Sequence, residues 1–265
     1  MKLFWSFTRQ SFHSTAVYRL EFWLQLVTSF LMMYSVHWIW TTLYTQAPGA
    51  FGVSLEQMVT YGILGMAMET VFHPGHGPQT YMASQVKSGS IDMDLMKPLD
   101  FHVHMLARNV GQLAFRLCTL AVPSLLVGYF VLGLRLPQSA AAGALFCVSI
   151  ALGYLVLFSL NYLLGLLAML TLNINSISWG YNALVRFFSG QMVPLWLFPG
   201  FVGAMAAALP FRGIYSIPLS IYIGQLSGTA AVQALLFQLA WVAVLMVLGR
   251  LAWLGVRARL VVQGG

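Results

Sequence analysis

Long stretches of this sequence carry no charged side chain. They run from Phe22 to Leu55, Leu117 to Leu134, Leu136 to Val185 and Gly213 to Gly249. About 20 apolar residues are enough for a helix to cross the hydrocarbon core of a bilayer. The third stretch is long enough for two crossings. We therefore expect most of the chain to lie in a membrane.

Composition supports this expectation. Charged residues make up 7% of the chain, against roughly 25% in soluble domains, and hydrophobic residues make up 59%. The net charge is +7, and the positions of the basic residues along the chain are more informative than their number. Nucleic acid is not an expected partner. The N-terminus lacks the pattern of a cleavable signal, because Lys2, Arg9, Arg19 and Glu21 precede the first apolar run. That run should remain as a span.

The apolar runs predict an all-α polytopic membrane protein with six transmembrane helices. We place these at about 22–44, 55–72, 112–134, 140–170, 177–192 and 230–254. The far end of the first carries Trp38, Trp40 and Tyr44, which is typical of a membrane–water interface.

The basic residues predict the orientation of the chain. With six spans, both termini share one side with the polar segment 73–108. That side collects Lys2, Arg9, Arg19, Lys87, Lys97, Arg108, Arg250, Arg257 and Arg259, whereas the other side has Arg135 and Arg212. An excess of Lys and Arg marks cytoplasmic loops, so the termini and this segment should be cytoplasmic. Residues 1–21 are expected to form an interfacial segment on that surface.

Glycines and prolines repeatedly interrupt the apolar sequence after the fifth predicted span. They include Gly190, Pro194, Pro199 and Pro210, and they exclude one straight helix. Because 187–211 carries no charge, we expect a re-entrant hairpin at 193–211, in which a short helix near 201–209 returns to the outer surface. A kinked extracellular amphipathic loop is the alternative.

The polar segment predicts a short helix over 79–87 that stops at Gly89, since glycine readily adopts a left-handed helix cap. The following stretch, 91–97, alternates apolar and acidic residues before Pro98. Such a segment is suited to presenting a small surface to another protein. The alternative is an ordinary polar loop, although the segment is longer than a simple connection requires.

The order of several motifs resembles that of ABC-2 type transporter permeases. The motifs are Ser88-Gly89-Ser90-Ile91 leading to Leu95–Leu99, then Phe187–Pro199, Leu209–Phe211, Tyr215–Pro218 and Gly224-Gln225. Each motif is weak alone, but their order and spacing cover nearly the whole chain. They are most similar to the six-span subgroup associated with daunorubicin-type and viologen-type drug efflux.

The resemblance implies a single transmembrane permease domain over 1–265, paired with an identical or a sister permease and with two cytoplasmic ABC ATPase subunits. ATP and Mg would bind to the ATPase, and this chain would hold no cofactor. Its setting would be a bacterial cytoplasmic (inner) membrane and its lipid, and its substrate an amphipathic, hydrophobic or cationic drug.

The resemblance also implies roles for particular residues. A coupling helix seated on the ATPase would include Tyr81, Met82, Ser84, Gln85, Lys87 and Gly89. The hairpin, with Gly190, Pro194, Trp196, Pro199 and Pro210, would close the extracellular end of the path. Independently of the resemblance, the sequence contains no G-x-x-x-x-G-K-[ST] loop, so any ATP hydrolysis requires a separate polypeptide. The chain is thus not expected to be an enzyme.

Three ionisable residues fall in or near predicted spans, where such groups are costly and often functional. They are Glu69, Arg116 and Arg186. Glu69 could pair with either arginine or reach the interface. We expect no metal site, because His73, His76, His102 and His104 lack the spacing of helical zinc ligands.

Three other classes of protein compete with the exporter. A secondary transporter predicts inverted repeats and mid-membrane charges, which are not evident. An intramembrane enzyme needs a convergent catalytic cluster, and none stands out. A membrane scaffold stays open on sequence grounds. Gly62 and Gly65 are too close to form a G-x-x-x-G pair, so small residues do not assign a packing face.

Overall fold

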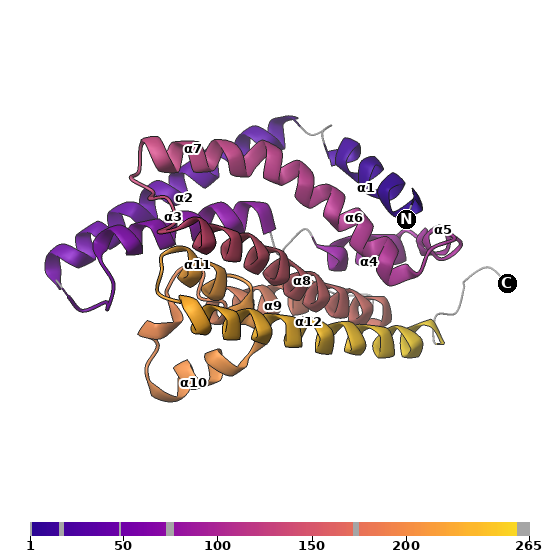
Figure 1. Ribbon diagram of the computed structural model, residues 1–265. Helices are drawn as coiled ribbons and strands as arrows, with labels where there is room; N and C mark the ends of the chain where they lie inside the picture. The colour runs from indigo at the N-terminus through magenta and orange to yellow at the C-terminus, as the bar shows by residue number, and fades with distance from the viewer. Residues whose placement is uncertain (1, 16–18, 48, 73–76, 172–174, 259–265) are drawn as a thin grey trace.

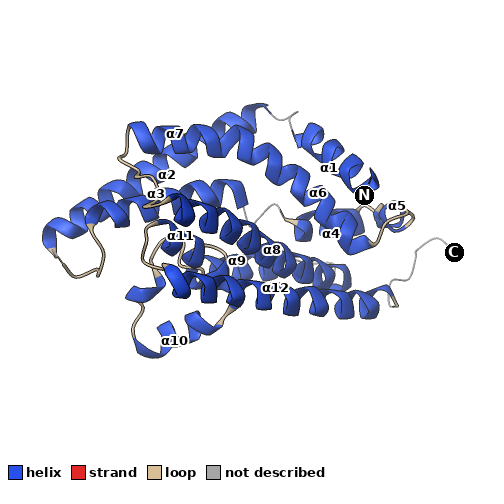
Figure 2. Ribbon diagram, viewed as in Figure 1, coloured by secondary structure: helices blue, strands red, loops and turns tan. Residues whose placement is uncertain are grey.

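The structure is a computed structural model that describes residues 2–15, 19–47, 49–72, 77–171 and 175–258. Throughout this described part the regular structure is helical (Figure 2). In chain order the helices are α1 (Lys2–Thr15), α2 (Arg19–Gln46), α3 (Leu55–Phe72), α4 (Pro78–Lys87), α5 (Ile91–Leu95), α6 (Phe101–Arg116), η2 (Leu117–Ala121), α7 (Val122–Phe130), α8 (Ala140–Thr171), α9 (Asn175–Phe188), η3 (Leu195–Leu197), α10 (Gly200–Ala208), η4 (Pro210–Gly213), α11 (Ser216–Tyr222) and α12 (Gly228–Arg257).

The long helices run roughly along one direction and give the molecule two distinct ends (Figure 1). One end holds α1, α4, α5 and the end of α12. The opposite end holds the α2–α3 connection, and α10 lies toward it. The most extensive helix pairs are α8 with α12, α1 with α6, α2 with α3, and α4 with α8.

Helix α3 is the most buried long element, and the main apolar cluster forms around it. It begins at a reciprocal cap, in which the Ser54 hydroxyl accepts from the Gln57 backbone N–H at 3.2 Å and the Gln57 side chain accepts from the Ser54 N–H at 2.9 Å. Burial on all sides explains why its sequence is apolar around the whole circumference.

The third predicted span starts earlier than the sequence indicated. Asp100 caps α6 by accepting from the N–H groups of His102 and Val103, and helix then continues from Phe101 to Phe130. The last part of the predicted cytoplasmic segment 73–108 therefore belongs to a helix that is long and apolar enough to cross a membrane. The helix widens to a π segment, η2, immediately before Pro123, which cannot donate a backbone hydrogen bond.

Within the described residues, three helices are long and apolar enough to cross a membrane: 101–130, α8 and α12. Helix α10 and the helical segment 210–222 meet at an angle of 68°. If these two together form one broken span, the number of candidate spans is four. The other predicted spans fold as helices close to their expected bounds but are less apolar or shorter. Helix α3 includes Glu56 and Glu69, and α9 has 14 residues. Apart from the start of the third, the predicted spans therefore agree with the helix bounds to within about four residues, while the number of spans stays a prediction.

The hairpin region differs in detail from the expectation. The segment that packs most deeply is not the predicted helix near 201–209 but η4 and α11, since every residue of α11 is buried and α11 lies against α8. The Gln238 side chain on α12 donates to the Gly213 carbonyl at 2.7 Å and to the Ser149 carbonyl at 3.0 Å. Helix α10 is mostly exposed, and Phe201 on it is 80% exposed. The seated part of the hairpin thus extends beyond the predicted limit of 211.

Candidate functional site: a coupling end and a membrane cavity

Helix α4 has one face against the bundle and one face in solvent. Met82 is fully buried on α8, where the absence of a side chain at Gly165 leaves room for it. Ser84 and Lys87 lie on the exposed side. Gln85 is partly exposed, and its carbonyl joins the helix cap. The predicted contact set is therefore corrected at Met82, which packs α4 onto α8 and cannot itself reach a partner protein.

The predicted end of this helix at Gly89 is confirmed. Gly89 has a φ of 68°. Its N–H donates to the Val86 carbonyl at 3.2 Å, and the Ser90 N–H donates to the Gln85 carbonyl at 2.9 Å. These two bonds form a Schellman motif, which requires a left-handed residue at the Gly89 position. The motif fixes where α4 ends and how the chain turns into α5.

We expect Gly89→Ala to destabilise this turn by about 1 kcal/mol, because an L side chain is disfavoured in the left-handed region. Faster amide hydrogen exchange at Ser90 and in the last turn of α4 would report it. Gly89→Asn is the matched control, since asparagine tolerates that conformation. Equal exchange in the alanine and asparagine variants would contradict the role of the backbone conformation.

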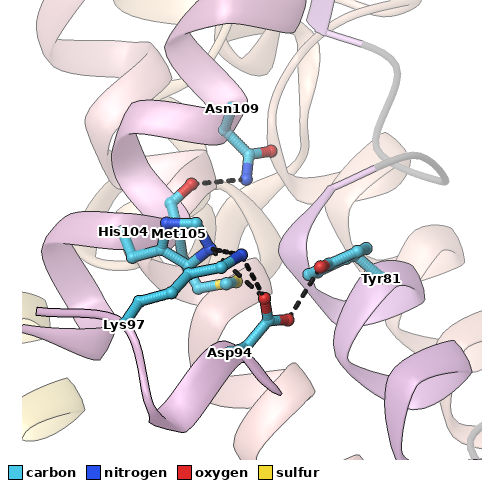
Figure 3. A network of polar contacts seen from close by, with 6 residues as sticks. All are labelled: Tyr81, Asp94, Lys97, His104, Met105 and Asn109. Carbon is cyan, nitrogen blue, oxygen red and sulfur yellow. Dashed lines mark hydrogen bonds and ion pairs between the residues drawn. The ribbon is translucent and has the colours of Figure 1, made fainter. Parts of the chain in front are cut away.

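A buried carboxylate joins α4 to α5 and α6 (Figure 3). Asp94 accepts from the Tyr81 hydroxyl at 2.7 Å and from the Lys97 ammonium at 2.6 Å. The His104 ring nitrogen Nε2 lies 3.5 Å from the same carboxylate and 3.2 Å from Lys97 Nζ. Tyr81, predicted as a contact residue, thus serves partly to attach α4 to this network.

The electrostatics of the network keep Asp94 ionised. Burial alone would raise the pKa of its carboxyl, but hydrogen bonds with His104, Lys97 and Tyr81 outweigh burial and hold the pKa well below its usual range. Burial, followed by the hydrogen bond to Asp94, raises the pKa of Tyr81 to about 12. At neutral pH a phenol therefore donates to a carboxylate, which is a strong charge-assisted hydrogen bond.

Helix α1 completes this end of the molecule by lying along α6. The Thr8 hydroxyl donates to the Ala107 carbonyl at 3.1 Å, and the Phe7 ring meets the edge of His104 with centroids 4.6 Å apart. The Arg108 guanidinium lies 3.7 Å from the centre of the Tyr81 ring. The predicted interfacial segment 1–21 is thus helical over Lys2–Thr15 and reaches the same network.

Two of the three ionisable residues that fall in or near predicted spans form an ion pair with each other. Glu69 on α3 forms an ion pair with Arg186 on α9 at 3.0 Å and accepts a hydrogen bond from the Gln191 side chain. This settles the pairing that the sequence left open. Arg116 lies at the end of α6, where it lines a small pocket with Tyr154 and Asn161.

A cavity of about 510 Å³ opens beside this ion pair, between α2, α3 and the end of α9. Its apolar lining is largely methionine: Met32, Met66 and Met192, together with Leu24. Hydroxyl groups line it too, and the Thr70 hydroxyl donates to the Ser29 hydroxyl at 3.0 Å. Methionine side chains adapt to ligands of different shape, so this lining suits a variable apolar body.

Two of the predicted hairpin residues, Gly190 and Trp196, contact Tyr61 on α3. The Gly190 carbonyl accepts from the Tyr61 hydroxyl, and Gly190 has a φ of 73°. Pro194 precedes η3, where the Trp196 indole donates to the Phe51 carbonyl at 3.2 Å. Pro199 and Pro210 begin α10 and η4 respectively. These residues define the ends of the short helices, as the sequence pattern indicated.

Metal ligation finds no support among the described residues, which hold no group of three or more His, Cys, Asp or Glu side chains that could bind an ion. His104 belongs to the Asp94 network, and His102 packs on Tyr162 with ring centroids 4.4 Å apart. His73 and His76 lie outside the described residues.

Sequence reasoning missed two members of these sites. Asp94 was read only as part of an alternating stretch, and its burial was not anticipated. Gln191 was quoted within a motif, yet its bond to Glu69 requires the turn at Gly190. A lone acidic residue between apolar neighbours, three positions before a lysine, was the available signal for Asp94.

Comparison with known protein families gives a match over most of the chain. The model of a family described as "ABC-2 family transporter protein" matches residues 20–264. The match includes α4, the Asp94 network and the membrane cavity. No curated protein matches the chain.

Proposed function

The chain belongs to the ABC-2 transporter family, and we propose that it is the membrane-spanning permease subunit of an ATP-driven exporter. A separate cytoplasmic ABC ATPase, carrying ATP and Mg, would supply the energy. Proteins of this family are typically permeases without catalytic activity, and the sequence has no P-loop of its own.

The observation that carries this proposal is the two-faced helix α4. Its buried side is seated on α8 through Met82, and Asp94 holds it to α6 through Tyr81 and His104. Its other side presents Ser84 and Lys87. Because α4 is attached to α8 and α6 and has an exposed outer face, a partner bound to that face could move α4, and this movement would be transmitted to the spanning helices.

Membrane orientation follows from the same end of the molecule. The basic residues Lys87, Lys97, Arg250 and Arg257 belong to the end that holds α4 and the last turns of α12, whereas Arg135 precedes α8. We propose that this basic end faces the cytoplasm of a bacterium, with both termini there and six spans in the inner membrane.

Two such chains, identical or sister permeases, would form the complete path. The exposed aromatic and methionine side chains of α2 and the cavity beside Glu69 would face that path, and the hairpin from Gly190 to Tyr222 would close it toward the outside. The apolar, adaptable lining favours an amphipathic substrate, including drugs.

The test is purification of the tagged chain in detergent, with mass spectrometry of the proteins it retains. We expect an ABC ATPase to co-purify. Replacing Ser84 and Lys87 by glutamate should abolish this association, because it changes the charge of the exposed α4 face without entering the core.

Arg257→Glu is the control variant, since it also replaces an exposed basic residue by glutamate at the same end of the molecule, but on α12. It should leave the association intact. A stable chain that never retains an ATPase, or equal loss in both variants, would overturn the proposal.

A further inference from the structure

The ion pair beside the membrane cavity is asymmetric. The Arg186 side chain is 59% exposed, whereas that of Glu69 is 24% exposed. Glu69 already accepts from two donors, Arg186 and Gln191. The positive member of the pair is therefore the accessible one.

The number of hydrogen-bond donors on Arg186 also indicates that this residue can bind a further group. A guanidinium carries five N–H donors in a planar fork, and Nη2 lies 3.0 Å from a carboxylate oxygen of Glu69. A second acceptor can bind the rest of the fork without breaking the ion pair. A cation, by contrast, must compete with Arg186 for Glu69, and success would leave the guanidinium unpaired at membrane depth.

The apolar residues that line the cavity determine which body the ligand can carry besides its charged group. Met32, Met66, Met192 and Leu24 surround the space next to Arg186, and the cavity of about 510 Å³ holds a body of several rings or a short acyl chain. Charge and apolar surface thus lie at neighbouring parts of one cavity.

We propose that this cavity binds an acidic amphiphile, whose sulfonate, carboxylate or phosphate group pairs with Arg186 and whose apolar body lies against the methionines. The proposal rests on the proposed function and refines it, because it changes the expected substrate from a cationic drug to an anionic one. Glu69, which itself accepts from Gln191, holds the arginine in place for that contact.

The test uses two probes with the same ring and opposite charge, naphthalenesulfonate and naphthylmethylammonium. Equilibrium dialysis measures their binding to the purified permease in nanodiscs of zwitterionic lipid, with no ATPase present. We expect the anion to bind more tightly. Arg186→Gln should weaken anion binding about tenfold or more, as expected for the loss of a charge-assisted hydrogen bond.

Glu69→Gln should change anion binding in the opposite direction to Arg186→Gln. The substitution removes a negative charge next to the bound anion, while the amide oxygen of glutamine can still accept from Arg186 and orient it, so anion binding should become stronger. A purely structural ion pair would instead predict weaker binding of both probes in both variants. The combination of Glu69→Gln with Arg186→Gln leaves no lone charge, so loss of anion binding there cannot come from an unpaired group. Unchanged anion binding in Arg186→Gln, or tighter binding of the ammonium probe to the unmodified protein, would overturn the proposal.

The source of the acidic group is resolved by a second set of nanodiscs that contain phosphatidylglycerol. Anion binding that persists there supports a freely exchanging amphiphile. Binding lost there identifies an anionic lipid headgroup as the occupant and overturns the substrate assignment. Because the assay omits the ATPase, failure of the cavity proposal and failure of ATPase association are separate results.

Discussion

Asp94→Ala should abolish the proposed coupling of this chain to an ABC ATPase while leaving the two proteins associated. The substitution leaves the Tyr81 hydroxyl, Lys97 and His104 without their shared acceptor. Removing one partner of a buried ion pair typically costs 3–5 kcal/mol, and since Lys97 is 30% exposed and can turn to water we expect about 3 kcal/mol. The exposed face of α4 is unchanged, so binding of the ATPase should survive.

Two measurements test this expectation. Hydrogen exchange should become faster in 78–87, because Tyr81 on α4 loses its hydrogen bond to the carboxylate that also contacts His104 on α6. In the reconstituted complex, the response of ATP hydrolysis to transported amphiphile should fall about tenfold, which is within the usual range of coupling energies.

Asp92→Ala is the matched control, because Asp92 lies on the same short helix α5 outside the network. Asp94→Asn separates shape from charge, since the amide oxygen can still accept from Tyr81. If Asp94→Ala left both exchange and coupling at the level of the Asp92 variant, the network would have no role in transmission.

The helix bounds were largely predictable from the sequence for simple physical reasons. Apolar runs predicted the bounds of α2, α3, α8 and α12 to within about three residues, because a helix must be long enough to cross the bilayer. Gly89 was predictable because a left-handed cap has few alternatives to glycine. These are local constraints, which a single sequence contains in full.

Contacts between distant helices were not predictable in the same way. Gly62 and Gly65 were set aside because their spacing does not match a two-helix motif. In the structure they serve different neighbours, since a Cβ at Gly62 would meet Val36 on α2 and one at Gly65 would meet the Gln191 carbonyl. Spacing rules describe one interface, whereas a central helix such as α3 packs against several.

The ion pair illustrates the same limit. Glu69 and Arg186 are far apart in sequence, and Arg116 was an equally good partner until α9 was placed beside α3. The seat of the hairpin also depends on a distant residue, Gln238, which lies on the last helix. A single sequence identifies candidate contact partners, and the packing of the helices determines which of them meet.

Gly153→Ala should displace the hairpin from its seat and leave the coupling end intact. A Cβ at this position on α8 would lie 2.7 Å from the Gly213 carbonyl oxygen and 3.0 Å from that of Ile214. Both obstacles are backbone atoms, so the hairpin itself must shift, and overpacking of this kind costs about 1–3 kcal/mol. The shift also breaks the 2.7 Å bond from Gln238 to Gly213.

Labelling of a reporter cysteine measures the displacement. Ser216→Cys places a thiol at a buried position at the start of α11, after Cys118 and Cys147, which are both exposed, are replaced by serine. A membrane-impermeant maleimide should label it slowly in the parent and several-fold faster with Gly153→Ala. Association with the ATPase should be unchanged, because the clash lies far along α8 from the seat of α4 at Gly165.

Gly143→Ala makes the same chemical change near the start of α8, where the new Cβ meets only a Pro137 side-chain atom at an ordinary 3.4 Å. Both variants gain the higher helix propensity of alanine, worth up to about 1 kcal/mol, so the difference between them isolates the clash with the hairpin. Equal labelling in the two variants would mean that α11 is held by its other contacts. Faster labelling of the cysteine at position 216 in the Gly153→Ala variant, but not in the Gly143→Ala variant, would show that the clash displaces the hairpin. If the ATPase is still bound, closure of the outer end is separate from coupling at the inner end.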